Sequence, residues 1–479
     1  MTDFTPARRP IASLTICFVL WKALLMAVAR ISPGFGYDTS STLLLARDAL
    51  GPDVGGSFSP LLMRLTRWDG IFYAKISERG YVYEQEWAFG WGFTRLLSLI
   101  AKACSSSCTT VEAHVWAGIV ISHLSHFASV LVLHSLVQKL HPLSVDKKTA
   151  FVAAVLHIVS PAGLFLSAPF SESLFSFLSF AGTWLFLHST CNAQDQRKFS
   201  QDLFILVAGT LFGLATTVRS NGLFNGLMVA FEFIHESCEL VQDITSFPIW
   251  RRFISLGAAG ILLAAGFVGP QAIAFFEICR SSPHSSYPRT WCNGSFTPSI
   301  YTWVQKHYWG TGFLKYWKIS NIPLFILSSP MLYFLIVSAL EILTSVARPA
   351  DYRHTRSNTH NEDIVMSQKS DSRSVSSNTK APRKNILLRL ALPQLLVSVL
   401  ALTYFHVQII NRLSSGYPLW YLWVASQLVE DHSVFVPTQR RTNPSAKRPS
   451  GSQSQIIVRG MVMYAIIHAG LFSCFLPPA

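Results

Sequence analysis

The sequence predicts an all-α fold, a bundle of helices that cross a membrane many times. Half of the 479 residues are hydrophobic and only 13% are charged, whereas a typical soluble domain carries about 25% charged residues. The apolar residues also gather in runs of about 20, the length of helix that crosses ~30 Å of hydrocarbon. A soluble core would divide the same residues among shorter runs, so the two observations together indicate a multi-pass membrane protein.

About eleven segments have the composition and length of a membrane span. The first of them ends on the small residues AVA, so a cleaved signal peptide stays open as an alternative for it, although Lys22 within the run argues against a signal-peptide core. The segments expected to span are 11–29, 114–138, 150–168, 172–190, 203–218, 222–240, 254–277, 323–345, 386–408, 416–430 and 456–476.

The distribution of basic residues predicts the orientation of these spans. Arg8 and Arg9 precede the first span and place the N-terminus in the cytosol. Alternating from there puts the basic clusters on the cytosolic side, at 139–148, 197–198, 251–252, 346–385 and 440–448. The formal net charge of +14 therefore reports membrane orientation, and we expect no nucleic-acid partner.

This orientation divides the chain into three parts. Residues 1–345 form a membrane core with lumenal loops at 30–113 and 278–322, and residues 386–479 form the C-terminal spans. The polar stretches 346–385 and 431–455 are predicted to be disordered cytosolic loops, since they are poor in apolar residues. The segment 89–101 carries Arg95 and is predicted to be an interfacial or re-entrant helix.

Two features of the lumenal loops leave alternatives open. Cys104 can pair with Cys108, and Cys279 with Cys292, if the loops face an oxidising lumen, and otherwise all four are free thiols. Asn293 begins the sequon NGS, which makes it a potential glycosylation site.

Four polar clusters fall on the predicted lumenal side. Taken singly, each has a structural explanation: an acid at a helix start, a snorkelling arginine, an aromatic belt or the end of a span. Taken together, carboxylates, cations and aromatic rings on one membrane face favour a sugar-transfer site, because polar groups at membrane depth are costly and usually line a functional cavity. The clusters are RWDG from Arg67, SAPFSES from Ser167, TTVRSNG from Thr216, and the pair KHYWG from Lys306 and HVQIINR from His406.

The same stretches carry a resemblance to a known family. The segments WDGIFYAKISERGYVYEQEWAFG, SAPFSESLFS, HYWGTGFLKYWKISNIPLF and HVQIINRLSS, in this order between residues 67 and 415, resemble the fungal GPI mannosyltransferase 2 family of glycosyltransferase family 76. The resemblance implies a GT-C fold in the endoplasmic reticulum membrane with a lumenal active site. It also implies that mannose moves from dolichyl-phosphate-mannose to the first mannose of a GPI-anchor precursor in α-1,6 linkage. A small membrane accessory subunit fits this setting.

On this basis we assign roles to ten residues. Asp69 is the expected general base for the attacking hydroxyl, and Glu172 is expected to orient the acceptor or a lysine. No DxD-type pair lies near these loops, so we expect neither a metal nor a cofactor. The expected substrate-binding residues are Trp68, Arg219, Asn221, His307, Tyr308, Trp309, His406 and Arg412.

Three alternatives belong to other classes or substrates. A GT-C enzyme with a different lumenal acceptor would share this layout. A lipid or sugar transporter or scramblase would place charges at the bilayer midplane and show internal symmetry, and no repeat is visible in the sequence. A structural subunit of a membrane complex would tolerate the loss of Asp69.

Overall fold

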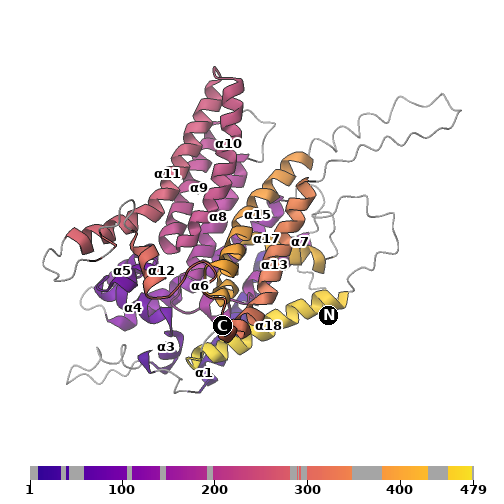
Figure 1. Cartoon of the computed structure of the whole chain (residues 1–479). Coiled ribbons are helices and arrows are strands. Elements are labelled where there is room, and N and C mark those ends of the chain that lie inside the picture. The colour runs from indigo at the N-terminus through magenta and orange to yellow at the C-terminus, as the bar shows by residue number, and fades with distance from the viewer. Residues whose placement is uncertain are drawn as a thin grey trace.

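A computed structural model describes residues 9–33, 39–41, 59–104, 110–140, 147–190, 198–280, 289, 291–292, 299–347, 380–429 and 451–476. Every regular element within these ranges is a helix, which confirms the predicted all-α class. Figure 1 shows long helices side by side and a group of short helices gathered at one end of them.

Each predicted span overlaps one α-helix of the structure. Seven of the described helices are long and apolar enough to cross a membrane, namely α1, α6, α9, α11, α13, α15 and α18, so the predicted count of about eleven is not confirmed. The helices that correspond to the predicted spans are α1 (Pro10–Ile31), α6 (Val111–Leu140), α7 (Lys147–Ile158), α8 (Glu172–Thr190), α9 (Phe199–Val218), α10 (Gly226–Gln242), α11 (Phe247–Phe275), α13 (Ile322–Ala347), α15 (Lys380–Thr403), α17 (Pro418–Leu428) and α18 (Gly451–Ser473).

Short helices occupy the connections that were predicted to be lumenal. They are α3 (Pro60–Leu65), α4 (Asp69–Arg79), α5 (Trp91–Cys104), α12 (Ile300–His307) and α16 (Ile410–Leu413). Helix α5 confirms a helix in the segment 89–101; it buries Phe93 and Leu97 and exposes Leu99. The start of α8, the connection from α9 to α10 and the connection from α15 to α17 were all predicted to be lumenal. They meet at one end of the bundle, beside α4, α5 and α12 (Figure 1).

The centre of the bundle depends on close helix packing. Helix α9 lies between α8 and α11. A Cβ on Gly266 of α11 would come within 2.1 Å of the carbonyl oxygen of Gly213 on α9. Only glycine permits this approach, which is typical of helices that pack within membranes.

The structure corrects one predicted span substantially. Residues 150–168 do not form one helix: α7 ends at Ile158, and only a single helical turn, Gly163–Leu166, follows before α8. Pro161 lacks the N–H that a continuing helix needs, and Gly163 has a φ of +47°. The predicted span 386–408 is also too long, because α15 ends at Thr403.

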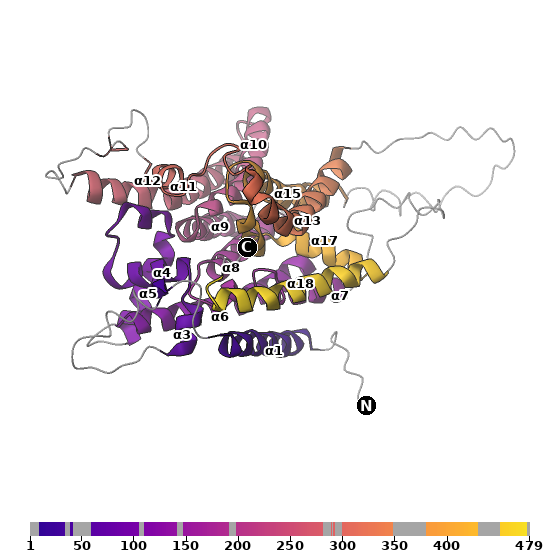
Figure 2. The same cartoon turned by 60° about the horizontal axis from the view of Figure 1, so that its bottom comes forward.

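Helix α1 is an integral part of the bundle. Leu14 and Leu25 are fully buried, and the helix packs against α7 and α18; Figure 2 shows α1 and α18 side by side. Most of the predicted loops 346–385 and 431–455 lie outside the described residues. Helices α15 and α18 nevertheless begin at Lys380 and Gly451, earlier than those predicted loops end.

Candidate active site

Asp69 lies at the first position of α4. The residue before it, Trp68, has a φ of 52°, which side-chain-bearing residues rarely adopt and which is often found at functional sites. The helix N-terminus favours the negative charge of the carboxylate. Its Oδ2 atom lies 2.7 Å from Nη1 of Arg412, on the short helix α16.

Glu172 joins the same group of charges. It begins α8, and its Oε1 atom lies 2.6 Å from Nη1 of Arg219 and 3.5 Å from Nε of Arg412. Asp69, Glu172, Arg219 and Arg412 therefore form one contiguous arginine–carboxylate cluster with two negative and two positive charges. Four separate stretches of the sequence contribute to it.

The two carboxylates differ in access. The Asp69 side chain is 31% exposed, whereas that of Glu172 is only 1% exposed. A substrate hydroxyl can therefore reach Asp69, while Glu172 holds the two guanidinium groups from inside. Among the described residues, the ion-pair partners of Glu172 are Arg219 and Arg412 and not a lysine; its expected role in orienting the acceptor stays a prediction.

Two residues that sequence reasoning missed support the cluster. The Tyr73 hydroxyl lies 2.8 Å from Oγ of Ser171, and Nη1 of Arg219 donates a 3.1 Å hydrogen bond to the same oxygen. Burial raises the pKa of the Tyr73 hydroxyl above its usual range. Tyr73 lies one helical turn after Asp69 and Ser171 directly precedes Glu172, so their spacing from the predicted acids is the only sequence signal that pointed towards these positions.

The neighbouring carboxylates stabilise the positive charge of Arg412. Burial lowers the pKa of its guanidinium, but the carboxylates of Asp69 and Glu172 raise that pKa more, and the net shift is upward. The guanidinium also lies 5.1 Å from the centre of the Phe165 ring, within the range of a cation–π contact. Arg412 is therefore a permanent cation that packs against an aromatic ring.

A cavity of about 350 Å³ lies beside the cluster and is lined by Arg219. One part of its wall is polar and contains three further predicted residues, Asn221, Trp309 and His406. Asn221 donates a 3.2 Å hydrogen bond to the Tyr417 hydroxyl, and Nε2 of His406 lies 3.1 Å from the carbonyl oxygen of Trp309. The apolar lining includes Leu223, Phe224, Phe267, Leu400, Phe405, Ile409 and Leu413.

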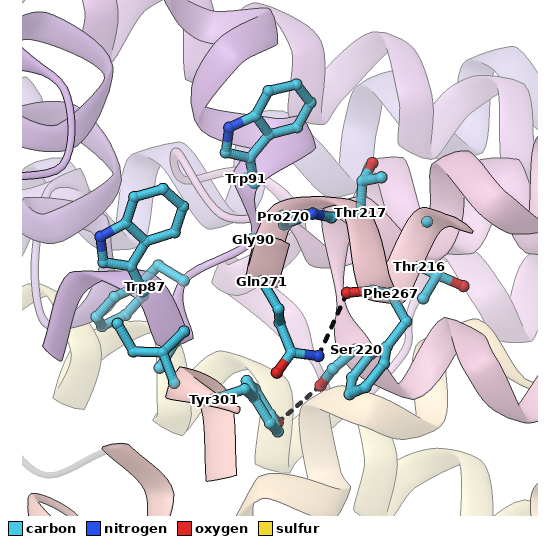
Figure 3. Close-up of a pocket in the computed structure, with 14 residues that line it drawn as sticks. Trp87, Gly90, Trp91, Thr216, Thr217, Ser220, Phe267, Pro270, Gln271 and Tyr301 are labelled. Carbon is cyan, nitrogen blue, oxygen red and sulfur yellow. Dashed lines mark hydrogen bonds between the residues drawn. The ribbon is translucent and has the colours of Figure 1, made fainter. Parts of the chain in front are cut away.

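A second pocket of about 50 Å³ adjoins this cavity, and the two share Ser220, Phe267 and Tyr301. Figure 3 shows Ser220 and Tyr301 joined by a hydrogen bond, which is 2.7 Å long between their oxygens. Burial raises the pKa of the Tyr301 hydroxyl. Trp87 and Trp91 form part of the wall of the smaller pocket, so the larger cavity continues towards an aromatic surface.

The remaining predicted residues lie away from the reacting groups. Trp68 flanks Asp69 in sequence, but its ring packs against Phe475 with 4.8 Å between centres. His307 is exposed and stacks on Trp303 at 4.7 Å, and Tyr308 is 45% exposed. Neither His307 nor Tyr308 lines the cavity, so the structure brings together seven of the ten predicted residues around the cluster and the cavity.

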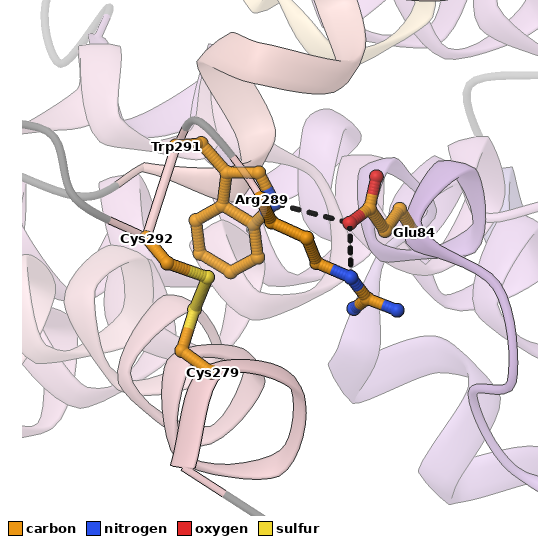
Figure 4. Close-up of a disulfide and its surroundings, with 5 residues drawn as sticks. All are labelled: Glu84, Cys279, Arg289, Trp291 and Cys292. Carbon is orange, nitrogen blue, oxygen red and sulfur yellow. Dashed lines mark hydrogen bonds and ion pairs between the residues drawn. A yellow bond between two sulfur atoms is a disulfide. The ribbon is translucent and has the colours of Figure 1, made fainter. Parts of the chain in front are cut away.

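A disulfide fixes the neighbouring loop. Cys279 and Cys292 are bonded, with 5.8 Å between their Cα atoms, which settles one of the two open pairings. Figure 4 shows Glu84 beside this disulfide: it accepts a 3.2 Å hydrogen bond from Nε1 of Trp291 and pairs with Arg289 at 3.1 Å. Cys104 is a free, exposed thiol, so its expected pairing with Cys108 is not found. Asn293 lies outside the described residues, and its glycosylation stays a prediction.

Comparison with known proteins gives the chain its family. The profile of the family described as Mannosyltransferase (PIG-V) matches residues 11–479. A protein of Aspergillus fumigatus named GPI mannosyltransferase 2 is 40% identical over 98% of this chain and 94% of its own length. Its namesake in Gibberella zeae is 39% identical over 98% of both chains.

Among solved structures, an oligosaccharyltransferase of Archaeoglobus fulgidus in complex with an inhibitory peptide and a dolichol-phosphate is 14% identical, with a TM-score of 0.44. The likeness covers 99% of this chain and 57% of that one, and it is too weak to carry an argument. The sequence relatives and the family profile agree with each other over nearly the full length. The chain therefore belongs to the mannosyltransferase (PIG-V) family and is a glycosyltransferase.

Proposed function

We propose that this enzyme transfers mannose from dolichyl-phosphate-mannose to the first mannose of a GPI-anchor precursor, in α-1,6 linkage. The relatives named GPI mannosyltransferase 2 support the GPI precursor as acceptor. The observation that carries the proposal is the arginine–carboxylate cluster, which joins an accessible acid to two guanidinium groups and reaches a cavity of about 350 Å³ through Arg219.

In this reaction Asp69 is the general base. Its carboxylate takes the proton of the 6-hydroxyl as that oxygen attacks the anomeric carbon of the donor. A bond from the hydroxyl oxygen to this carbon forms while the bond from the carbon to the phosphate oxygen breaks, and dolichyl phosphate leaves with the electron pair. One such displacement converts the β-linked donor of this family into an α-linked product.

Arg219 and Arg412 receive the charge of the leaving phosphate. Guanidinium groups bind phosphate oxygens with paired, charge-assisted hydrogen bonds. Because Arg412 is paired with Asp69 at 2.7 Å, a phosphate bound to Arg412 competes with that carboxylate. Donor binding would thus release Asp69 to accept the proton, while Glu172 keeps hold of both arginines.

We propose that the reaction uses no metal ion, because these two guanidinium groups already supply the positive charge that a phosphate leaving group needs. The measurement is the transfer rate of purified protein before and after excess chelator. We expect an unchanged rate, and a rate that falls with chelator and returns with an added divalent cation would contradict the proposal.

We place the cluster on the lumenal side of the endoplasmic reticulum membrane, with the N-terminus in the cytosol. The Cys279–Cys292 disulfide supports this side, since disulfides persist in oxidising compartments. Tyr83 and Thr245 are both exposed and lie at opposite ends of the bundle. In sealed microsomes an impermeant maleimide should label Tyr83→Cys only after permeabilisation and Thr245→Cys before it. The reverse pattern would contradict the assignment.

The decisive experiment supplies purified protein with dolichyl-phosphate-mannose and monomannosylated GPI lipid. We expect a dimannosylated product whose new linkage is cleaved by an α-1,6-specific mannosidase. A product of another linkage, or transfer only to another lumenal acceptor, would replace this proposal with that of a related enzyme. Transfer by the chain alone would also show that no accessory subunit is required, whereas we expect a small membrane subunit to raise the rate.

A transporter or scramblase is the second candidate. The arrangement of the charges argues against it, because the cluster lies where α8 begins and α9 ends rather than half way along the helices. Reconstituted vesicles distinguish the two candidates. Movement of fluorescent glycolipid between leaflets without any mannosylated product would favour the transporter.

A further inference from the structure

A buried, mostly non-helical segment contributes residues to the active site. Residues 159–171 connect α7 to α8, and every residue from Ser160 to Ser171 is buried. Backbone groups outside a helix must find other partners when they lie within a membrane bundle. The side chains that hydrogen-bond to the backbone of this segment therefore determine the position of its last residues.

Two neighbouring helices supply those partners. Nζ of Lys22, on α1, donates hydrogen bonds of 2.8 Å to the carbonyl oxygen of Leu166 and 2.7 Å to Oγ of Ser167. Oγ of Ser122, on α6, lies 2.8 Å from the carbonyl oxygen of Ala168 and 3.2 Å from that of Phe170. The segment is thus held from both sides by contacts distant in sequence.

The restrained segment leads directly into the reacting groups. Phe165, beside Leu166, lies against the Arg412 guanidinium. Ser171 bonds Tyr73 and Arg219, and Glu172 follows it. A displacement of the Leu166–Ser167 backbone would therefore move contacts to both arginines of the cluster.

The chemistry of Lys22 is unusual for a purely structural contact. Its side chain is buried, with 6% exposed, and its two acceptors are neutral oxygens, assisted by the Phe18 ring at 5.3 Å. A buried lysine amino group is costly within a membrane helix, and ionisable residues there usually serve a function. A glutamine amide would supply a neutral donor without that cost.

We propose that Lys22 is a positioning residue for the active site: through Leu166 and Ser167 it sets the placement of Phe165, Ser171 and Glu172 around the two arginines. The inference rests on the proposed function for its kinetic consequence. Its structural consequence, the restraint of residues 160–171, does not depend on which substrate the enzyme uses.

The test compares Lys22→Met, which keeps most of the length of the side chain and removes the donors, with Lys22→Arg, which restores hydrogen-bond donors at a similar reach. In Lys22→Met we expect the amides of 160–171 to exchange with solvent roughly 10-fold faster, because two hydrogen bonds that restrain the segment are lost. We expect kcat to fall roughly 10- to 100-fold, the effect of a misplaced reacting group, with little change in KM. Lys22→Arg should recover part of both.

Ser398→Ala is the matched control, since it removes a buried hydroxyl that bonds within α15; exchange at 160–171 and kcat should not change. If Lys22→Met does not fold, Ser167→Ala removes one of the two acceptors and should shift exchange and kcat in the same direction, more weakly. Unchanged exchange at 160–171 overturns the proposal, whatever happens to kcat. Faster exchange in a protein that transfers no mannose even as wild type overturns the proposed function and leaves the positioning role supported.

Discussion

Within the described residues, one arginine–carboxylate group lies at each end of the bundle, and the two groups differ in access. At the active-site end, Asp69 is 31% exposed and Arg219 lines a cavity. At the opposite end, Arg252 pairs with Glu232 at 2.9 Å and with Glu236 at 2.7 Å, and Arg389 also pairs with Glu232. The side chains of that second group are only 4% to 9% exposed.

Because the two groups share their chemistry and differ in access, ion pairing by itself does not mark a catalytic site. The second group, which we call the closed cluster (Glu232, Glu236, Arg252 and Arg389), joins α10, α11 and α15 and satisfies its own charges. The arginine–carboxylate cluster has the same chemistry, but one of its acids can be reached from outside. Variants of the two clusters should therefore separate catalysis from stability.

The largest expected effect is that of Asp69→Asn. Removing the general base should lower kcat by roughly 10²- to 10⁴-fold, while the thermal transition of the protein stays near that of wild type. Transfer of labelled mannose by purified protein measures the rate. Glu78→Gln, on the same helix and paired with Lys75, is the control and should keep its activity. Transfer by Asp69→Asn at the wild-type rate would exclude the base assignment.

Arg252→Met breaks the closed cluster and should show the opposite profile. It leaves Glu232 and Glu236 without one shared partner, and such a loss costs about 3–5 kcal/mol of folding free energy. Thermal unfolding in detergent should detect it, whereas transfer per folded molecule should not change. His235→Ala, which removes an exposed pair with Glu239, should barely alter stability. A stable Arg252→Met protein without activity would contradict the comparison.

Arg412→Lys tests the contacts that the Arg412 guanidinium makes with Asp69 and Glu172. An ammonium group cannot contact Asp69 and Glu172 with the paired geometry of a guanidinium. The loss of one charge-assisted hydrogen bond should lower kcat/KM for the donor roughly 10- to 100-fold. Arg389→Lys makes the same change in the closed cluster and should leave kcat/KM unaltered. Equal kinetic effects of the two variants would remove the distinction between the clusters.

The smallest expected effect concerns the cavity wall. His406 lines the cavity and stacks on Tyr316 at 4.7 Å, so His406→Ala should raise the donor KM roughly 2- to 10-fold, the value of one hydrogen bond. His307 lies outside the cavity, and His307→Ala should leave KM unchanged. Steady-state kinetics at varied donor concentration compares them, and a larger effect of His307→Ala would show that the donor binds elsewhere.

Much of the fold follows from the sequence because apolar run length and helix formation are linked in a membrane. The prediction for 150–168 failed where this link breaks: an apolar run containing Pro161 and Gly163 can be buried without being helical. Hydropathy reports burial, and local backbone chemistry decides the conformation.

The site was predicted in part for a similar reason. Glu172, Arg219 and Arg412 stand out as charges near predicted span ends, and Asp69 as an acid in a predicted lumenal loop. Which acid meets which arginine depends on tertiary contacts. His307 and Tyr308 were included because they adjoin Trp309 in sequence, yet His307 instead stacks on Trp303 of α12. Lys22 and Tyr73 were missed because their partners lie in other segments.

Binding of dolichyl phosphate is the most direct measurement of the central claim, that the arginine–carboxylate cluster receives the phosphate of the donor. Titration of purified protein should give a weaker affinity in Arg412→Met than in wild type. It should give a tighter affinity in Asp69→Asn, because the carboxylate no longer competes for Arg412. Affinities equal to wild type in both variants would contradict the claim.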